Sequence, residues 1–359
     1  MLLATLTLAV SACAAAEADL SGVLETVRAK HGLPALGAAV LKGGKVVAIG
    51  AVGKRRLGDS EAVTVDDRWH LGSLTKAMTA TLVARLVERG RLRWDMTLGE
   101  AFPAFAPKMH AGYRAVTLER LLTHFGGVPA DVPPELWSEL WRMQGTPTEQ
   151  RLTLVRGLAV EKPGPDAFLY SNAGYALAGA MAEAREEKPW ETLLKIHVLA
   201  PLGMTSTGFR APEGHHPWGH AWRDGKAVPV PPGPQADNPP GIAPAGAVHA
   251  TLRDWAKFAL LHLEGAQGKA RLLRPQTFSK LHMAPLGQVH GMGWIIVNRP
   301  WAGGRALTHA GSNTMWYAVV WLAPEKDFGV LVATNLGGGP AEKAADEAAA
   351  ALIEKWCPR

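Results

Sequence analysis

Cysteine and charge are both scarce in this sequence of 359 residues. Its two cysteines are Cys13 and Cys357. Cys357 has no evident partner once a leader containing Cys13 is removed, so we expect no structural disulfide, and neither cysteine has the neighbours of a catalytic or zinc-binding thiol. Charged residues make up only 19% of the chain, and hydrophobic residues make up 47%. This composition excludes a disordered chain and is typical of a well-packed globular protein.

Several catalytic and binding motifs are also absent. The sequence has no Gly-x-Ser-x-Gly nucleophile elbow, no phosphate-binding P-loop and no His-Glu-x-x-His metalloprotease motif. The net charge is +6, but the basic residues are scattered and their one compact cluster, 54–56, is typical of a solvated hairpin tip, so we expect no nucleic-acid partner. His215, His216 and His220 could gather around a metal, but they lie in a proline-rich segment without acidic neighbours. We therefore expect neither a metal site nor a cofactor.

The first 19 residues are predicted to form an export signal. Residues 1–16 are apolar, are too few to span a bilayer and end in small residues. Residues 10–13 have the pattern of a bacterial lipoprotein cleavage box, in which Cys13 would become the lipidated first residue and tether the protein to a membrane. Ordinary cleavage after one of residues 14–16 is the alternative. We expect an exported protein that is periplasmic or anchored as a lipoprotein.

Hydrophobic periodicity predicts helices and strands in an order typical of an α+β fold. Strands from both ends of the chain are expected to pair into one antiparallel sheet flanked by helices. The predicted parts are an α/β lobe over 20–95 and 246–359, and a mainly helical lobe over 96–245. The helical lobe is expected to end in a long surface loop or edge segment over 209–245. Strands are predicted at 36–41, 45–52, 62–69, 291–297, 306–309, 317–322 and 328–334, and helices at 20–32, 73–90, 118–124, 135–143, 149–158, 173–184, 190–199, 252–263 and 341–355.

The stretch from Trp69 to Lys76, followed by the apolar run 77–87, carries the clearest chemical signal. Apolar residues recur at helical spacing after Ser73, so Ser73 is expected to open a buried helix. Residues three apart share a helix face, so the Lys76 amine can reach the Ser73 hydroxyl. A desolvated lysine loses its proton readily and can accept the proton of a serine nucleophile. A single Ser-x-x-Lys also occurs by chance, with the serine as an ordinary helix cap.

Two later motifs follow the Ser73–Lys76 pair in the sequence. Tyr-Ser-Asn at 170–172 precedes a predicted helix, and His-Ala-Gly-Ser at 309–312 ends a predicted strand. Together with Ser-x-x-Lys, this ordered set resembles the serine β-lactamase and penicillin-binding protein superfamily. The resemblance covers about residues 20–355 and includes side signatures at 121–129 and 321–324, typical of the class C β-lactamase, DD-peptidase and esterase branch. It implies a β-lactamase/transpeptidase-like fold.

The resemblance implies a catalytic role for four residues. Ser73 would be the nucleophile that accepts the acyl group, and Lys76 with Tyr170 would take its proton. His309 would stand in the same groove. Positive charge on Lys76 and His309 is expected to lower the pKa of the Tyr170 phenol, so that the phenol could activate Ser73 and later a water molecule.

The same resemblance implies the groups that bind the substrate. Asn172 would hydrogen-bond the acyl side of the substrate and fix Lys76. The backbone N–H groups of Ser73 and Ser312, beside Gly311, would form an oxyanion hole. Asp131, which follows a predicted Gly-Gly turn, either borders the groove or is only a turn residue.

The chain departs from the β-lactamases of this branch at one motif. They carry Lys-Thr-Gly where this chain has His309-Ala310-Gly311, so a permanent cation and a hydroxyl that bind a substrate carboxylate are missing. We therefore expect a serine hydrolase that acts on small ester or amide substrates in preference to β-lactams. D-Alanyl-D-alanine carboxypeptidase or weak β-lactamase activity is the alternative, because His-x-Gly also resembles a secreted DD-peptidase. From another class, the alternative is a non-catalytic penicillin-binding or cell-wall sensor protein.

Overall fold

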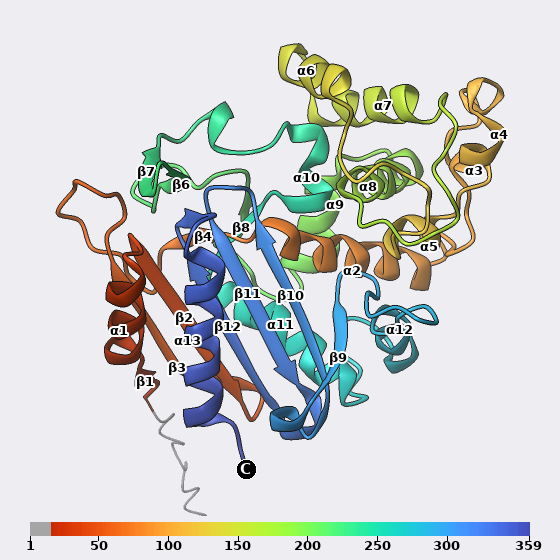
Figure 1. The fold of residues 1–359 in the computed structure, drawn as a ribbon. Coiled ribbons are helices and arrows are strands. Elements are labelled where there is room, and N and C mark those ends of the chain that lie inside the picture. Colours follow the sequence, from red (N-terminus) through yellow and green to blue (C-terminus); the bar gives the residue numbers. More distant parts are fainter. Residues whose placement is uncertain (1–15) are drawn as a thin grey trace, which may run out of the picture.

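Strands from both ends of the chain form one seven-stranded sheet in the computed structural model, which describes residues 16–359 (Figure 1). In spatial order the strands are β1 (Ala18–Asp19), β3 (Lys45–Gly53), β2 (Ala35–Lys42), β12 (Phe328–Thr334), β11 (Tyr317–Ala323), β10 (Gly304–Ser312) and β9 (Ile295–Arg299). All neighbours are antiparallel except β1 and β3, which are parallel. The predicted pairing of strands from the two ends is confirmed, because β2 pairs with β12.

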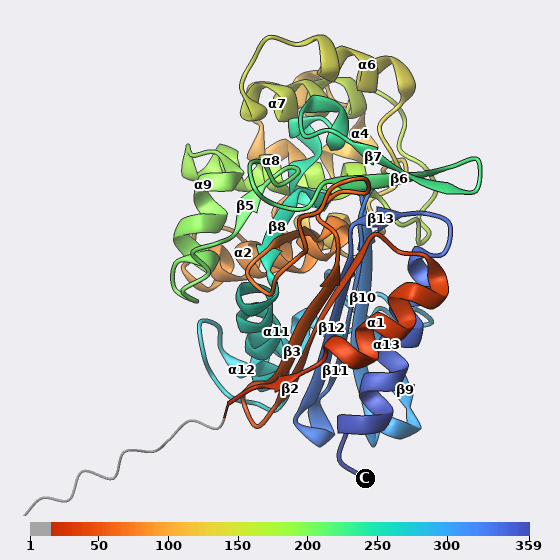
Figure 2. The same cartoon turned by 90° about the vertical axis from the view of Figure 1, so that its left-hand side faces the viewer.

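Helices cover both faces of this sheet, so its strands bury side chains on both sides. The flanking helices are α1 (Ser21–His31), α13 (Ala341–Trp356), α2 (Thr75–Glu88) and α11 (Leu252–Ala266). In β12, Val330 belongs to the apolar core under α1 and α13, whereas Leu331 belongs to the core that includes α2 and α11 (Figures 1 and 2). A strand buried on both faces reads as a continuous apolar run, which explains its clear signal in the sequence.

A group of helices between α2 and the returning strands forms the second part of the molecule. These are α3 (Leu98–Ala101), α4 (Ala111–Arg114), α5 (Leu118–Leu122), α6 (Pro134–Arg142), α7 (Pro147–Leu158), α8 (Asn172–Glu186) and α9 (Trp190–Leu194). Helix α8 lies among them and is rich in alanine and glycine, so its neighbours approach closely. A Cβ added at Gly179, for example, would lie 2.4 Å from Pro244 Cγ. The first residue of α8, Asn172, contacts Lys76 of α2, which brings residues 170–172 to the helix that packs on the sheet.

The segment 209–245, predicted as a long surface loop or edge segment, contains secondary structure of its own. It contains a hairpin of β6 (Gly219–Arg223) and β7 (Lys226–Val230), and β13 (Leu336–Gly337) pairs with β6 to complete a three-stranded sheet. The segment ends at the start of helix α10 (Ala243–Gly246). The hairpin turn is Asp224-Gly225, with φ of +49° and +75°, a favoured two-residue turn sequence. Proline in β7 obscured the alternation of the strand pattern. Parts of the segment are deeply buried, including Asp237 at 5% exposure.

Smaller elements complete the fold. The extended piece predicted at 62–69 is a strand only at β4 (Arg68–His70), which pairs with β8 (Val248–Thr251), and β8 pairs in turn with β5 (Gly208–Phe209). Helix α12 (Pro275–Leu281) was not predicted. Across residues 16–359, no helix is both long and apolar enough to cross a membrane.

The predicted lipidation site, Cys13, lies outside the described residues, as do residues 1–15 of the predicted leader. Ala18 and Asp19, the last residues of that predicted leader, pair with Ala48 and Ile49 of β3. The structure therefore includes the end of the predicted leader in the sheet.

Candidate active site

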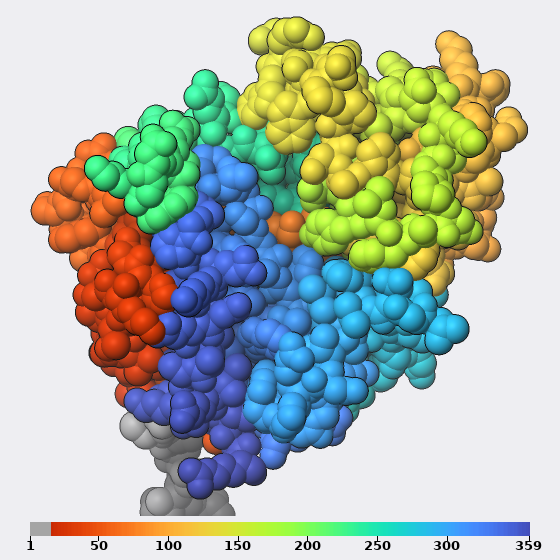
Figure 3. All heavy atoms as spheres, viewed as in Figure 1, coloured from red at the N-terminus to blue at the C-terminus, as the bar shows by residue number. Residues whose placement is uncertain are grey.

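Ser73 lies in a short 3-10 turn, Gly72–Leu74, directly before α2. A hydrogen bond links the residue after this turn to β8: the Thr75 hydroxyl accepts a hydrogen bond of 3.0 Å from the backbone N–H of Val248. Ser73 is partly exposed, whereas the neighbouring side chains of α2 are buried. Figure 3 shows a hollow between the blue strands and the yellow-green helices, in which orange atoms of the segment around α2 are visible. The serine therefore stands at the junction of the two parts of the molecule.

Lys76 is fully buried one helical turn after Ser73. Its Nζ lies 3.1 Å from Ser73 Oγ, 2.6 Å from Asn172 Oδ1 and 2.9 Å from the backbone oxygen of Ala245. The structure thus brings together Ser73, Lys76 and Asn172, as the sequence predicted. Three oxygen atoms around one nitrogen fix its position and keep it in contact with the serine oxygen.

Burial decides the charge of this amine. Removal from water lowers the pKa of Lys76 to about 7, and the negative charge of Asp131 opposes that fall. Asp131 Oδ1 accepts a hydrogen bond of 2.6 Å from Asn172 Nδ2, so Asn172 bridges the lysine and the aspartate. At neutral pH a substantial fraction of Lys76 is therefore unprotonated and able to accept a proton. Asp131 borders the site, which decides between the two readings that the sequence left open.

Tyr170 packs beside Lys76 at the start of α8. The Lys76 Nζ lies 4.8 Å from the centroid of the Tyr170 ring, and the His309 ring centroid is 6.3 Å from the same point. Tyr170 also stacks on His124 at a centroid distance of 4.5 Å. His124 has a positive φ of 66°, and its Nδ1 accepts a 3.0 Å hydrogen bond from the Ser171 N–H. His124 thereby fixes the backbone next to Tyr170 as well as its ring.

The predicted lowering of the Tyr170 pKa is wrong. Burial raises the pKa of this phenol to about 12; a hydrogen bond with the Ser73 side chain offsets only part of that rise, and the charge of Asp131 adds to it. The cations assumed in that prediction are also weak, because burial lowers the pKa of His309 to about 3 and that of Lys76 to about 7. At pH 7, Tyr170 is therefore a neutral phenol and His309 a neutral imidazole.

Strand β10 passes directly over the turn that holds Ser73. A Cβ on Gly72 would lie 2.4 Å from the backbone nitrogen of Ser312, and a Cβ on Gly311 would lie 2.6 Å from that of Ser73. Gly72 also has a φ of +51°. Only glycine allows so close an approach at these positions. The two amides expected to form an oxyanion hole, Ser73 N and Ser312 N, therefore lie on adjoining segments.

The strand side of the site has few groups of its own that bind charge. His309 is 4% exposed, and its buried Nδ1 has no hydrogen-bond partner within residues 16–359. The Ser312 hydroxyl donates to the backbone oxygen of Trp316 at 2.6 Å and accepts from the N–H of Thr314 at 2.9 Å. A cavity of about 640 Å³ begins beside Ser312 and Thr314, and Arg223 lines its wall.

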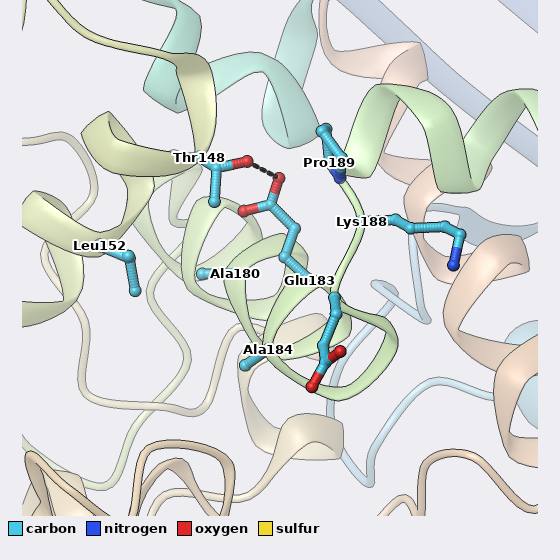
Figure 4. Close-up of a pocket in the computed structure, with 8 residues that line it drawn as sticks. Thr148, Leu152, Ala180, Glu183, Ala184, Lys188 and Pro189 are labelled. Atoms are coloured by element: carbon cyan, nitrogen blue, oxygen red, sulfur yellow. Dashed lines mark hydrogen bonds between the residues drawn. The ribbon is translucent and has the colours of Figure 1, made fainter.

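Another hollow, between α7 and α8, lacks the groups of a catalytic site (Figure 4). Its volume is about 290 Å³, and its most buried acid is Glu183. Glu183 Oε1 already accepts hydrogen bonds from Thr148, Arg151 and the backbone N–H of Trp190. A carboxylate with three donors is a structural anchor, so this hollow does not compete with the Ser73 site.

The histidines considered as metal ligands are separated by their contacts. Both nitrogens of the buried His220 face backbone groups: Nε2 accepts from the N–H of Leu57 at 3.1 Å, and Nδ1 lies 2.8 Å from the oxygen of Asn335. His216 instead faces Asp67 at 3.4 Å. Within the described chain, no three His, Cys, Asp or Glu side chains are grouped so as to hold a metal ion.

Two groups at the site escaped the sequence analysis: one contacts Lys76 and the other stacks on Tyr170. The backbone oxygen of Ala245 has no sequence signal, because any residue supplies a carbonyl. His124 had one: it lies in the signature 121–129, but nothing in its spacing showed that it stacks on Tyr170.

The fold and this site together define a class of serine hydrolases that includes β-lactamases and penicillin-binding proteins. The family model described as Beta-lactamase matches residues 20–355 of the chain. The protein therefore belongs to the β-lactamase family. This membership supports the general assignment of a serine hydrolase that acts through an acyl-enzyme.

Individual relatives agree with this assignment. Penicillin-binding protein 4 of Amycolatopsis lactamdurans is 27% identical over 337 residues, which span 88% of this chain and 84% of the relative. Protein flp of Staphylococcus aureus is 22% identical over 323 residues, 88% of this chain, but the match spans only 62% of that longer protein.

Solved structures show the same fold. The octameric penicillin-binding protein homologue from Pyrococcus abyssi matches with a TM-score of 0.74 and 27% identity, over 94% of this chain and 79% of that one. The class C β-lactamase from Rhodobacter sphaeroides matches with a TM-score of 0.73 and 22% identity, over 93% of this chain and 97% of that one. The second likeness speaks for the fold alone.

Proposed function

We propose that this protein hydrolyses small esters through an acyl-enzyme on Ser73. The observation that carries the proposal is the Lys76 amine, which is fully buried, has a pKa of about 7 and lies 3.1 Å from Ser73 Oγ. A general base is most effective when its pKa is near the working pH and it is within hydrogen-bond reach of the proton it removes. Lys76 meets both conditions.

In the proposed reaction, Ser73 Oγ attacks the ester carbonyl while its proton passes to neutral Lys76. The backbone N–H groups of Ser73 and Ser312 stabilise the negative charge on the carbonyl oxygen. The bond to the leaving alcohol then breaks, and the alkoxide takes a proton from the Tyr170 phenol, which Lys76 reprotonates. A water molecule then loses a proton to Lys76 while its oxygen bonds to the acyl carbon. The ester bond to Ser73 breaks, Ser73 Oγ takes that proton from Lys76, and the carboxylic acid leaves.

The preference for esters rests on the strand side of the site. His309 is neutral at pH 7, and Ala310 has a methyl group where a hydroxyl would be needed to bind a carboxylate. β-Lactams and D-alanyl-D-alanine peptides both carry a carboxylate next to the scissile bond, and a site without partners for it loses affinity. A neutral ester makes no such demand.

A D-alanyl-D-alanine carboxypeptidase is the second candidate, and one observation favours it. Arg223 lines the cavity that begins beside Ser312, and its guanidinium is a strong partner for a carboxylate. The relative from Amycolatopsis lactamdurans is named a penicillin-binding protein, which agrees with this candidate. Weak β-lactam hydrolysis would follow from the same contact.

The test offers purified protein three substrates: a chromogenic short-chain ester, a chromogenic cephalosporin and a D-alanyl-D-alanine peptide. We expect ester turnover that is lost in Ser73→Ala and unchanged in Arg223→Gln. Release of D-alanine that depends on both Ser73 and Arg223 would favour the peptidase. If no substrate is turned over and intact mass shows a stable β-lactam adduct, the result would favour a non-catalytic penicillin-binding sensor and overturn the proposal.

We also propose that the protein is exported, because residues 1–16 are apolar and end in small residues. Cell fractionation of the full-length chain tests this. If the protein is exported and lipidated, we expect it in the membrane fraction, and Cys13→Ser should release it from that fraction. If the leader is cleaved in the ordinary way, both the wild type and Cys13→Ser should be found in the periplasm. Accumulation in the cytoplasm would contradict the proposal.

A further inference from the structure

The segment between β7 and α10 carries a buried carboxylate that the proposed reaction does not use. Asp237 is 5% exposed, although it lies in a stretch rich in proline and glycine. Burying a carboxylate without a partner is strongly unfavourable, so a buried carboxylate is found together with specific hydrogen-bond donors. Besides the backbone N–H of the adjacent Asn238, Asp237 has two side-chain donors, and each belongs to a different segment beside Ser73.

The first donor is His70, which is fully buried at the end of β4. His70 Nε2 lies 2.8 Å from Asp237 Oδ2, and His70 Nδ1 accepts a 3.1 Å hydrogen bond from the backbone N–H of Gly72. A ring nitrogen that accepts a hydrogen bond carries no proton, so the proton is on Nε2 and points at the carboxylate. Asp237 therefore sets the tautomer of the ring that holds the residue before Ser73.

The second donor is Asn313, which follows Ser312. Its Nδ2 lies 3.3 Å from Asp237 Oδ1 and 3.1 Å from the backbone oxygen of Ala236. Its Oδ1 accepts hydrogen bonds of 3.2 Å from the N–H groups of Met315 and Trp316. Asn313 thus fixes the turn after β10, and Asp237 fixes Asn313.

The contacts through His70 and those through Asn313 both lead to the place where the backbones of Gly72 and Ser312 touch. We propose that Asp237 is a positioning residue that sets the relative placement of the two oxyanion-hole amides, acting through His70 on the Ser73 side and through Asn313 on the Ser312 side. The proposal rests on the proposed function, in which both amides stabilise the oxyanion. Donors that are already in place need no reorganisation when charge develops, so their placement affects the transition state more than the bound substrate.

Charge alone would predict the opposite effect. A buried carboxylate close to a developing oxyanion repels it, so removing the charge of Asp237 would speed the reaction if the residue acted only through its field. In Asp237→Asn, only one of the two oxygens remains, so the new NH2 group faces a donor in either orientation. Toward His70 it forces the ring to reverse its tautomer or turn away, and the Gly72 N–H loses its acceptor; toward Asn313 it breaks the contact on the Ser312 side. Positioning therefore predicts a slower enzyme and charge a faster one.

The experiment compares Asp237→Asn with the wild type and with Asp254→Asn. Asp254 is a matched control, because it is also nearly fully buried but bonds Ser206 and Lys257 instead of the segments around Ser73. We expect kcat for the short-chain ester to fall about 10- to 100-fold in Asp237→Asn with KM changed less than about twofold. The rate of phosphonylation of Ser73 by a fluorophosphonate probe should fall by a similar factor, and Asp254→Asn should retain both rates in its folded fraction.

A second variant guards against misfolding. Asn313→Ala breaks only the Ser312 arm and leaves the His70–Asp237 pair intact, so we expect a smaller fall in kcat, about tenfold, with circular dichroism unchanged. Equal or faster turnover in folded Asp237→Asn, or full kcat in Asn313→Ala, would overturn the inference. If wild-type protein neither turns over the ester nor reacts with the probe, the proposed function fails instead, so the two failures are distinguishable.

Discussion

The two sides of Ser73 differ in how completely their polar groups are engaged. On the helical side, the Lys76 amine has three hydrogen-bond partners, and Asn172 links it to Asp131. On the strand side, the buried Nδ1 of His309 has no partner in the described chain, and position 310 offers only a methyl group. The groups proposed to transfer protons contact one another without a ligand, whereas the groups that would bind a charged substrate are sparse.

This difference suggests separate roles for the two sides, one in the type of reaction and the other in the choice of substrate. The helical side matches the pattern of the whole superfamily, so we infer that it sets the type of reaction. The strand side is where the chain departs from that pattern, so we infer that it sets which substrates are accepted. Variants on the helical side should then slow every substrate alike, and variants on the strand side should change the ratio between substrates.

The largest expected effect is on the helical side. Lys76→Ala removes the proposed base, and we expect kcat for every substrate to fall about 10³-fold or more. Lys257→Ala, a lysine on α11 away from Ser73, is the control and should keep full activity. Steady-state assays with the ester and the cephalosporin measure both. A variant that keeps a tenth of the activity, or loses it for one substrate only, would break the division between the two sides.

The pH dependence tests the charge of the base. Lys76 must be unprotonated to act, so we expect kcat/KM to rise with pH through about 7, the pKa of the buried amine. Asp131 raises that pKa, so Asp131→Asn should shift the rise to lower pH. Asp166→Asn, an exposed aspartate paired with Arg120, should leave the profile unchanged. A shift to higher pH would show that Asp131 does not act on Lys76 through its charge.

The smallest expected effect is on the strand side. Ala310→Thr would restore the hydroxyl that β-lactamases of this branch carry in Lys-Thr-Gly, next to Gly311, which touches the Ser73 turn. We expect the ratio of cephalosporin to ester kcat/KM to rise about tenfold, the effect of one hydrogen bond to a charged group. The ester rate of the same variant is the internal control. An unchanged ratio would mean that preference is set elsewhere.

The sequence was informative where the chemistry is local or the pattern continuous. Ser73 and Lys76 are one helical turn apart, so their contact could be predicted from spacing alone. Strand β12 was found within its observed bounds, Phe328–Thr334, because it is buried on both faces. The contact of Asn172 with Lys76, by contrast, came from the family resemblance and could not be derived from spacing.

The errors arose where burial depends on distant segments. The pKa of Tyr170 was expected to fall because its charged neighbours could be named, but its burial, which raises that pKa, could not be seen. Asp237 lies in the segment predicted as a surface loop or edge segment, where proline and glycine leave no hydrophobic period. Its burial depends on packing against His70 and Asn313, which are 167 and 76 residues away in the chain.

The most direct test of the central claim is the intact mass of the enzyme after acid quenching during ester turnover, followed by peptide mapping. We predict a mass increase equal to the acyl group of the ester, located on the peptide that contains Ser73 and absent from Ser73→Ala. Turnover without such an adduct, or an adduct that persists in Ser73→Ala, would contradict the account.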